Sequence, residues 1–262
     1  TYPFQRQKFW IEAPNSTAGD AGNGVPVLHP FLGYRLASAG KEVLFQATLS
    51  ASAPHFLDDH RVQETVVFPL SGYLETALAA AGEYFAAGAH RLSNVEIYEP
   101  LIFPEGQEQT VQTVLTPDGE GKASFVLSSR SREDWTPHAA GSIQLEEEGS
   151  GPDQVSLEAL RSACPTELAV DEFYAGIRTL GTEYRPLFQG IRQLWKGEGQ
   201  SLGRLALPEA LVADGNYLLH PALLDACFQV VAAVLLEGEE QNTYMPVSVD
   251  AMRLHGRCGA TG

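Results

Sequence analysis

The chain has 262 residues, of which 44% are hydrophobic and 19% charged, so it contains enough apolar material for a sizeable globular core. Its formal net charge of -16 argues against nucleic acid as a partner, because nucleic-acid phosphates would be repelled. No apolar run approaches the ~20 residues that a membrane-spanning helix needs. The first residues lack the apolar stretch of a signal peptide, so we expect a cytoplasmic protein without membrane contact.

The three cysteines are Cys164, Cys227 and Cys258, and no two of them have CxxC spacing. Such a sparse, odd set predicts neither a disulfide framework nor a zinc site, which agrees with a reducing compartment. Cys227 lies in an apolar run and is expected to be a small core residue.

Two segments with the composition of linkers divide the chain. Residues 13–27 are rich in Gly, Ala, Asn and Pro, and a second such segment, EEEGSGPDQVS, lies near residues 146–156. The predicted organisation is a leading linker, a first block, a connecting linker and a second block, over residues 1–27, 28–148, 149–164 and 165–262.

The first block is predicted to be a sheet with one embedded helix. The helix is expected over Ser71–Phe85, where apolar residues recur at helical spacing. Short alternating or β-branched stretches bounded by turns predict the strands. They are expected at Glu42–Leu49, Arg91–Tyr98, Gln109–Leu115, Lys122–Ser129 and Gly141–Leu145.

The second block repeats this order of parts. A longer helix is expected over Pro221–Leu236, with an apolar stripe at Leu224, Phe228, Val231 and Leu235, because Pro221 is a favoured first residue of a helix. The remaining elements are a short helix at Val170–Leu180 and strands at Gly190–Lys196, Ser201–Leu207 and Val247–Leu254. Two blocks of this kind favour an α+β duplication.

His60 is the first candidate for chemistry. It precedes the first long helix, whose free N–H groups at the N-terminus can stabilise an oxyanion. A histidine near its ordinary pKa can accept a proton from carbon. A lone histidine is nevertheless more often structural than catalytic.

Asp225 and Gln229 form the second candidate. Both fall in the second long helix and share a face because they are four residues apart. Desolvation would raise the pKa of Asp225, as a general acid requires, and Gln229 can hold the carboxyl group by a hydrogen bond. The alternative is an acidic residue favoured by the positive end of the helix dipole.

These residues belong to a set of motifs that resembles the dehydratase domains of modular polyketide synthases. His60-x-x-x-Glu64-x-x-x-x-Pro69 resembles the family's HxxxGxxxxP, and Asp225-x-x-x-Gln229 resembles its DxxxQ. Four further segments resemble the GxxYGPxFQ loop, the HPLLG opening, the WTxHAxG strand and the preceding linker: Gly181–Gln189, His29–Gly33, Trp135–Gly141 and Tyr2–Trp10. The motifs follow the family's order from residue 2 to about residue 254.

The resemblance implies a double hotdog, in which two antiparallel sheets each wrap a long central helix. It also implies dehydration of a 3-hydroxyacyl thioester that an acyl carrier protein presents on phosphopantetheine. His60 would be the base and Asp225 the acid, facing each other across one tunnel, and no metal or redox cofactor would be needed. The expected supporting residues are Gln229, Tyr184, Pro69, Leu70 and Ser71, the last two through backbone N–H groups. The expected tunnel residues are Phe68, Pro186, Phe188 and His220, although His220 and His138 are also interpreted as structural.

The resemblance further implies other synthase domains in the same polypeptide and a homodimer. Three residues depart from the family's motifs: Glu64 and Arg185 replace glycines, and Leu70 stands where glycine or alanine is common. The family's second hotdog normally continues with more strands after Leu254, so the second block is expected to be incomplete.

Other activities use the same scaffold. A double-bond isomerase, a cyclase, a product-template domain or a pyran-forming dehydratase could employ the same histidine and aspartate. A non-catalytic hotdog kept as a structural element is the alternative from a different class, and Glu64 and Arg185 are its main support.

Overall fold

The computed structural model describes residues 25–27, 29–85, 89–131, 134–146, 155–214, 216–235 and 245–255. The expected linker over residues 1–27 lies almost entirely outside these ranges, together with the segment Tyr2–Trp10. Residues 149–154 of the second linker and Cys258 also lie outside the described residues.

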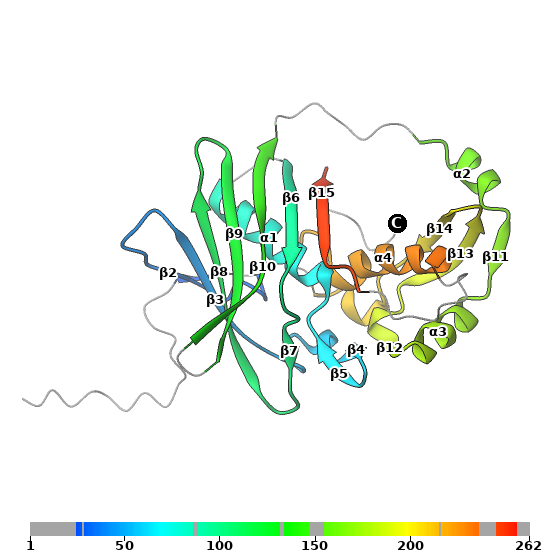
Figure 1. Ribbon diagram of the computed structural model, residues 1–262, viewed down its shortest axis with the longest axis horizontal. Helices are drawn as coiled ribbons and strands as arrows, with labels where there is room; N and C mark the ends of the chain where they lie inside the picture. The colour runs from blue at the N-terminus through cyan, green and yellow to red at the C-terminus, as the bar shows by residue number, and fades with distance from the viewer. Residues whose placement is uncertain are drawn as a thin grey trace, which may run out of the picture.

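An antiparallel sheet of eight strands dominates the first half (Figure 1). Along β3 and β9, buried residues alternate with more exposed ones, which is the pattern of a sheet with one face on a core. In spatial order the strands are β1 (Val25–Pro26), β2 (Tyr34–Leu36), β3 (Val43–Ser50), β8 (Glu108–Pro117), β9 (Lys122–Ser131), β10 (Asp134–Glu146), β6 (Ala89–Ile97) and β15 (Ser248–Leu254). The strands predicted for the first block are confirmed, and β10 begins seven residues earlier than expected.

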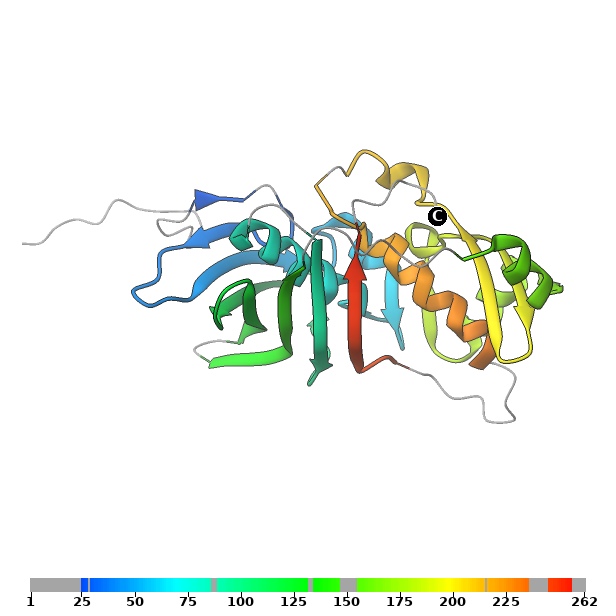
Figure 2. The same ribbon diagram turned by 90° about the horizontal axis from the view of Figure 1, so that it is seen from above.

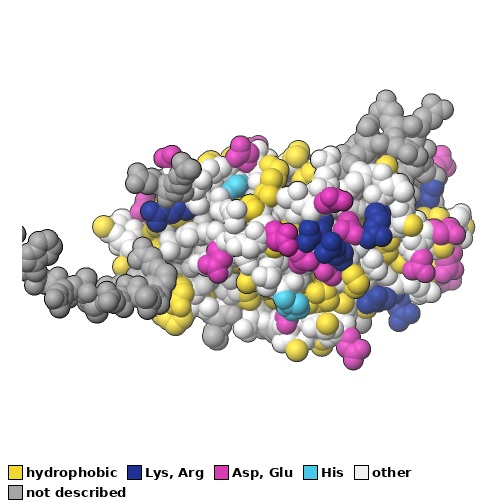
Figure 3. Space-filling view, turned by 90° about the horizontal axis from the view of Figure 1, so that it is seen from below, with side chains coloured by type: hydrophobic (Ala, Val, Ile, Leu, Met, Phe, Trp, Pro, Cys, Tyr) yellow, Lys and Arg dark blue, Asp and Glu magenta, His cyan; other side chains and the backbone are white. Residues whose placement is uncertain are grey.

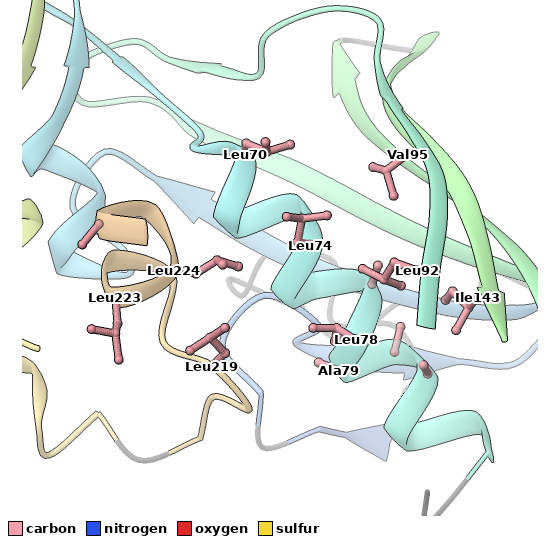
Figure 4. Packing of buried hydrophobic residues seen from close by; sticks show 14 of the residues in the cluster. Leu70, Leu74, Leu78, Ala79, Leu92, Val95, Ile143, Leu219, Leu223 and Leu224 are labelled. Carbon is pink, nitrogen blue, oxygen red and sulfur yellow. The ribbon is translucent and has the colours of Figure 1, made fainter. Parts of the chain in front are cut away.

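Helix α1 (Leu70–Phe85) packs on the inner face of this sheet. The apolar side chains of the helix meet Leu92, Val95 and Ile143 of the strands (Figure 4). The residues that predicted the helix are all buried, namely Tyr73, Leu74, Ala77, Leu78 and Ala81. This agreement follows because a helix with one apolar face buries that face against the nearest apolar surface.

The second half places helix α4 (Pro221–Leu235) against a smaller antiparallel sheet (Figure 2). This sheet has the order β11 (Thr166–Leu168), β13 (Ile191–Gly197) and β14 (Gln200–Leu205). Helix α3 (Val170–Thr179) and the 3₁₀ turns η2 (Pro186–Phe188) and η3 (Glu209–Leu211) also belong to this half, whereas the 3₁₀ turn η1 (His55–Asp59) belongs to the first. Each half therefore has one long helix on an antiparallel sheet, which confirms the α+β class.

Part of the predicted connecting linker is helical. Helix α2 (Leu157–Ala163) begins after Ser156, whose hydroxyl accepts a hydrogen bond from the N–H of Ala159. A serine in this position satisfies one of the free N–H groups at a helix start. The segment predicted as a linker over residues 149–164 therefore contains a helix at residues 157–163.

The predicted apolar stripe of α4 is buried only in its first part. Leu224 is buried, but Val231 and Leu235 are 52% and 45% exposed. Cys227, expected in the core, is exposed. In the described residues α4 contacts β13, β14, the 3₁₀ turn η2 and α1, and these contacts leave Cys227 exposed.

The two halves interlock through strand pairing as well as helix packing. Strand β15, predicted as part of the second block, pairs with β6 and so joins the sheet of the first half. A four-stranded sheet has the order β12 (Thr182–Tyr184), β4 (His60–Val62), β5 (Thr65–Val67) and β7 (Ile102–Phe103), so a strand of the second half lies beside a hairpin of the first. Helices α1 and α4 also contact each other. None of the helices in the described parts of the chain is long and apolar enough to cross a bilayer.

Candidate active site

A tight hairpin carries His60. The loop between β4 and β5 consists of Gln63 and Glu64, both with positive φ, 48° and 66°. Two such residues form the type I′ turn that suits a two-residue hairpin. Glu64 therefore adopts the left-handed backbone for which the family uses glycine.

The strand beside this hairpin brings Tyr184 next to His60. Gly181, with φ 91°, turns the chain from α3 into β12, which requires the backbone freedom of glycine. Strand β12 then pairs with β4 so that Tyr184 lies opposite His60, with ring centroids 5.7 Å apart. The GxxY spacing of the sequence thus has a local structural cause.

The hydrogen bond of His60 fixes its tautomer. The imidazole is buried, and Nδ1 lies 2.8 Å from the carbonyl oxygen of Val67. Because a carbonyl oxygen only accepts hydrogen bonds, Nδ1 carries the hydrogen and Nε2 of the neutral ring has a free lone pair. The ring of Phe188 packs against the imidazole at 5.1 Å and holds it in place.

Asp225 lies in the second turn of α4 and is almost completely buried. Burial raises the pKa of its carboxyl group, an effect that His60 and a hydrogen bond from Gln229 partly offset. Gln229 Nε2 donates to Asp225 Oδ2 at 2.8 Å and to the carbonyl oxygen of Phe188 at 2.9 Å. A raised pKa favours the protonated carboxyl group that a general acid needs.

Tyr174, which the sequence did not single out, completes this group of hydrogen bonds. Its hydroxyl donates to Gln229 Oε1 at 3.0 Å and accepts from the N–H of Ile191 at 3.2 Å. Burial raises the pKa of Tyr174 and of Tyr184, so both phenols stay protonated. The sequence signal for Tyr174 is weak, since a tyrosine in an amphipathic helix predicts only a partly buried position.

One cavity of about 390 Å³ is lined by residues from both halves. The predicted residues along its wall are His60, Phe68, Pro69, Leu70, Tyr184, Asp225 and Gln229. Most other lining residues are apolar, among them Val62, Val67, Ile97, Ile177, Phe228, Val231, Leu235, Met245 and Val247. Apolar walls with few convergent polar groups are typical of a site that binds a small molecule.

Three predicted tunnel residues lie outside this lining. Pro186 is exposed at the start of η2, and Phe188 is completely buried behind His60. His220 accepts a hydrogen bond from the N–H of Ala222 and so caps the start of α4. Its ring packs in an aromatic cluster with Phe56, and burial lowers its pKa to about 4. None of these three residues lines the cavity, because Phe188 and His220 pack among aromatic rings and Pro186 is exposed.

Leu70 and Ser71 begin helix α1, where the first N–H groups have no intrahelical partner. Leu70 lines the cavity, which places the positive end of the helix dipole beside it. The side chain of Ser71 is buried away from the cavity wall, so only its backbone N–H is relevant to the site.

The cation of Arg185 does not enter the cavity. Its guanidinium binds the carboxylates of Asp58 at 2.9 Å and Glu183 at 3.3 Å, and Arg178 also pairs with Glu183. On the face that carries β4, β5 and β12, Lys and Arg side chains gather between acidic ones (Figure 3). No group of three or more histidine, cysteine or acidic side chains in the described part of the chain is arranged to hold a metal ion.

Two family models match the chain. One, described as the polyketide synthase dehydratase domain, covers residues 29–130. The other, described as the polyketide synthase dehydratase N-terminal domain, covers residues 152–262. Together they include both His60 and Asp225.

A related protein is the spectinabilin polyketide synthase system protein NorA of Streptomyces orinoci, which is 33% identical over 241 residues. The match covers 89% of this chain but only 12% of NorA, so the chain corresponds to a small part of its curated relative.

Solved dehydratase domains of the curacin polyketide synthase have the same fold. The domain from the CurK module superposes with a TM-score of 0.85 at 33% identity, covering 89% of this chain and 85% of that one. The domain from the CurF module gives 0.83 at 37% identity, covering 88% and 84%. Two CurK variants, a histidine replaced by phenylalanine and an aspartate replaced by asparagine, are described as inactive. The fold is thus a double hotdog, and the chain belongs to the dehydratase domains of type I polyketide synthases.

Proposed function

We propose that this chain removes water from a 3-hydroxyacyl thioester, with His60 as general base and Asp225 as general acid. One observation carries the proposal: both side chains line the same apolar cavity, His60 with a free Nε2 lone pair and Asp225 with a raised pKa. The inactive histidine and aspartate variants of the related CurK domain support the same pair of roles.

The proposed step moves one proton at each end of the substrate. His60 Nε2 removes the proton from C2, and the released electron pair forms the C2–C3 double bond. The C3–O bond breaks as Asp225 gives its proton to the departing hydroxyl, which leaves as water. The products are an α,β-unsaturated thioester and water, and a net proton transfer from His60 to Asp225 restores both groups.

The start of helix α1 would stabilise charge on the thioester oxygen. Leu70 and Ser71 offer backbone N–H groups that have no partner within the helix. Such donors make the C2 proton more acidic because they stabilise the negative charge that develops on the carbonyl oxygen. The chemistry proposed here uses no metal or redox cofactor.

Delivery of the substrate would depend on tethering. Carrier proteins of this kind are usually acidic and this chain has a net charge of -16, so electrostatic attraction is not the main source of affinity. A carrier protein in the same polypeptide would supply an effective concentration of ~1 mM through its linker. We therefore propose an acyl carrier protein, neighbouring synthase domains and a second copy of the chain as partners.

The reaction is tested with a synthetic 3-hydroxyacyl thioester and mass spectrometry. We expect the wild type to yield a product lighter by one water. His60→Phe and Asp225→Asn should each slow this loss by roughly 10²–10⁴-fold, the usual contribution of a general acid or base. His55→Phe is the matched control, because the His55 side chain is 54% exposed and outside the cavity.

Other outcomes would contradict the proposal. A product of unchanged mass would indicate isomerisation or cyclisation on the same scaffold. Equal rates for the wild type and the His60→Phe variant would leave only a structural role for the domain.

A further inference from the structure

A row of hydrogen bonds leads to Asp225 from α3 and β13. One end of the row is a backbone N–H, which can only donate, and another is a backbone carbonyl oxygen, which can only accept. The N–H of Ile191 in β13 donates to the Tyr174 hydroxyl of α3. That hydroxyl meets Gln229 Oε1, and Gln229 Nε2 meets both Asp225 Oδ2 and the carbonyl oxygen of Phe188. Residues of β13, α3, η2 and α4 thus form one hydrogen-bonded group, which reaches Asp225 Oδ2 through Gln229.

The direction of every bond in this row follows from its ends. A backbone N–H only donates, so the oxygen of Tyr174 accepts from Ile191 and its own hydrogen is free for Gln229 Oε1. A backbone carbonyl only accepts, so the NH₂ group of Gln229 must face Phe188. A flipped amide would place oxygen against oxygen at Phe188 and NH₂ against the hydroxyl hydrogen of Tyr174.

We propose that Tyr174 is a positioning residue that determines, through Gln229, which oxygen of Asp225 carries the proton. Gln229 Nε2 donates to Oδ2, so Oδ2 is an acceptor and the proton resides on Oδ1. Among the described residues, no side chain or backbone group is hydrogen-bonded to Oδ1. Asp225 also lines the cavity. The proton is thereby held on the oxygen that remains free for a substrate hydroxyl, an inference that rests on the proposed function.

Tyr174→Phe tests this role because it keeps the ring and removes only the hydroxyl. Gln229 then loses one of the two contacts that fix its amide, and its hydrogen bond to the ionised form of Asp225 weakens. We expect the pKa of Asp225, followed by ¹³C NMR of its carboxyl carbon, to rise above the wild-type value. We expect kcat to fall by about tenfold and KM to change by less than about twofold, since the bound substrate still fits but the acid is weaker and less well directed.

Coupling through Gln229 is tested by a double variant. Gln229→Met removes the amide that links Tyr174 to Asp225, so adding Tyr174→Phe should slow the reaction no further. A double variant slower than Gln229→Met by the same factor as Tyr174→Phe alone would show that Tyr174 acts by another route and would overturn the proposal. This comparison also remains informative if the single Tyr174→Phe variant folds poorly.

Tyr217→Phe is the matched control, since Tyr217 is a buried tyrosine outside the main cavity. We expect it to keep the wild-type kcat and the wild-type pKa of Asp225. If Tyr174→Phe only lowers the melting temperature and matches this control in both readouts, its role is structural and the proposal fails. If the wild type releases no water, the proposed function fails, while the NMR titration still decides whether Tyr174 acts on Asp225.

Discussion

At the scale of single residues, the burial of Asp225 lowers the stability of the folded protein when its carboxyl group is ionised in the unfolded chain. Its folded-state pKa is raised because burial penalises the charged carboxylate. Below the unfolded-state pKa of about 3.9 both states hold the proton and there is no cost. The cost grows as pH rises from the unfolded-state pKa to the folded-state pKa and is fully present above the latter, at about 1.4 kcal/mol for each unit by which the pKa is raised.

Asp225→Asn should therefore stabilise the fold at neutral and alkaline pH. Asparagine fills the same space without a charge, so we expect a melting temperature several degrees above that of the wild type at pH 8, with the difference vanishing near pH 3.5. Thermal denaturation across this pH range measures the effect. Asp118→Asn, in an exposed turn, serves as control, and a gain independent of pH would contradict a buried ionisable group as the cause.

At the scale of elements, the hairpin of β4 and β5 carries His60, and its turn contains a residue, Glu64, with an unfavourable backbone conformation. Glu64 is exposed and has a φ of 66°, a backbone conformation that costs most residues roughly 1–2 kcal/mol. Glu64→Gly removes this strain, and the greater freedom of glycine in the unfolded chain offsets part of the gain. We expect a net stabilisation of about 0.5–1 kcal/mol in chemical denaturation.

The matched variant at this turn is Glu64→Ala, which removes the side chain but keeps a Cβ atom. If the backbone conformation is the cause, alanine should give no comparable gain. Equal stabilisation by both variants would assign the effect to the glutamate charge instead. Neither variant should change the hydrogen bond from Arg61 to the backbone carbonyl of residue 64, because that group remains in both.

At the scale of the whole molecule, Glu75 joins segments from both halves. It is completely buried in α1 and accepts hydrogen bonds from the backbone N–H groups of Leu218 and Leu219, just before α4. Its Oε1 also lies 3.1 Å from His29 Nε2, in the opening motif of the first half. Because His29 Nδ1 accepts from the N–H of Phe31, Nε2 is the donor toward Glu75.

Glu75→Gln should destabilise the protein by about 2 kcal/mol, because the amide NH₂ group would face a donor and leave a buried N–H without an acceptor. Urea denaturation measures the loss. Glu83→Gln makes the same substitution at an exposed position of α1 and should change stability by less than about 0.5 kcal/mol. Equal effects at both positions would show that the contacts of Glu75 do not link the two halves.

Local patterns predicted much of the architecture. Helix α1 and strands β3, β8 and β9 follow from periodicity, since each buries one face against a neighbouring element. Motif spacing predicted His60, Asp225 and Gln229 as site residues, because each motif depends on a local turn or on one face of a helix. Helix α2 was missed, since Ser156 follows a stretch of linker composition that concealed the start of the helix.

The sequence by itself determined the α+β class, the two helix-centred halves and the residue types at the site. Only the tertiary structure decided that β12 pairs with β4, that β15 joins the first sheet, and that Phe188 and His220 lie behind the cavity wall. Tyr174 also became visible only there, because its link to Gln229 spans 55 residues of chain. Periodicity and spacing report on contacts within a few residues, whereas pairing between distant segments depends on how the two halves pack together.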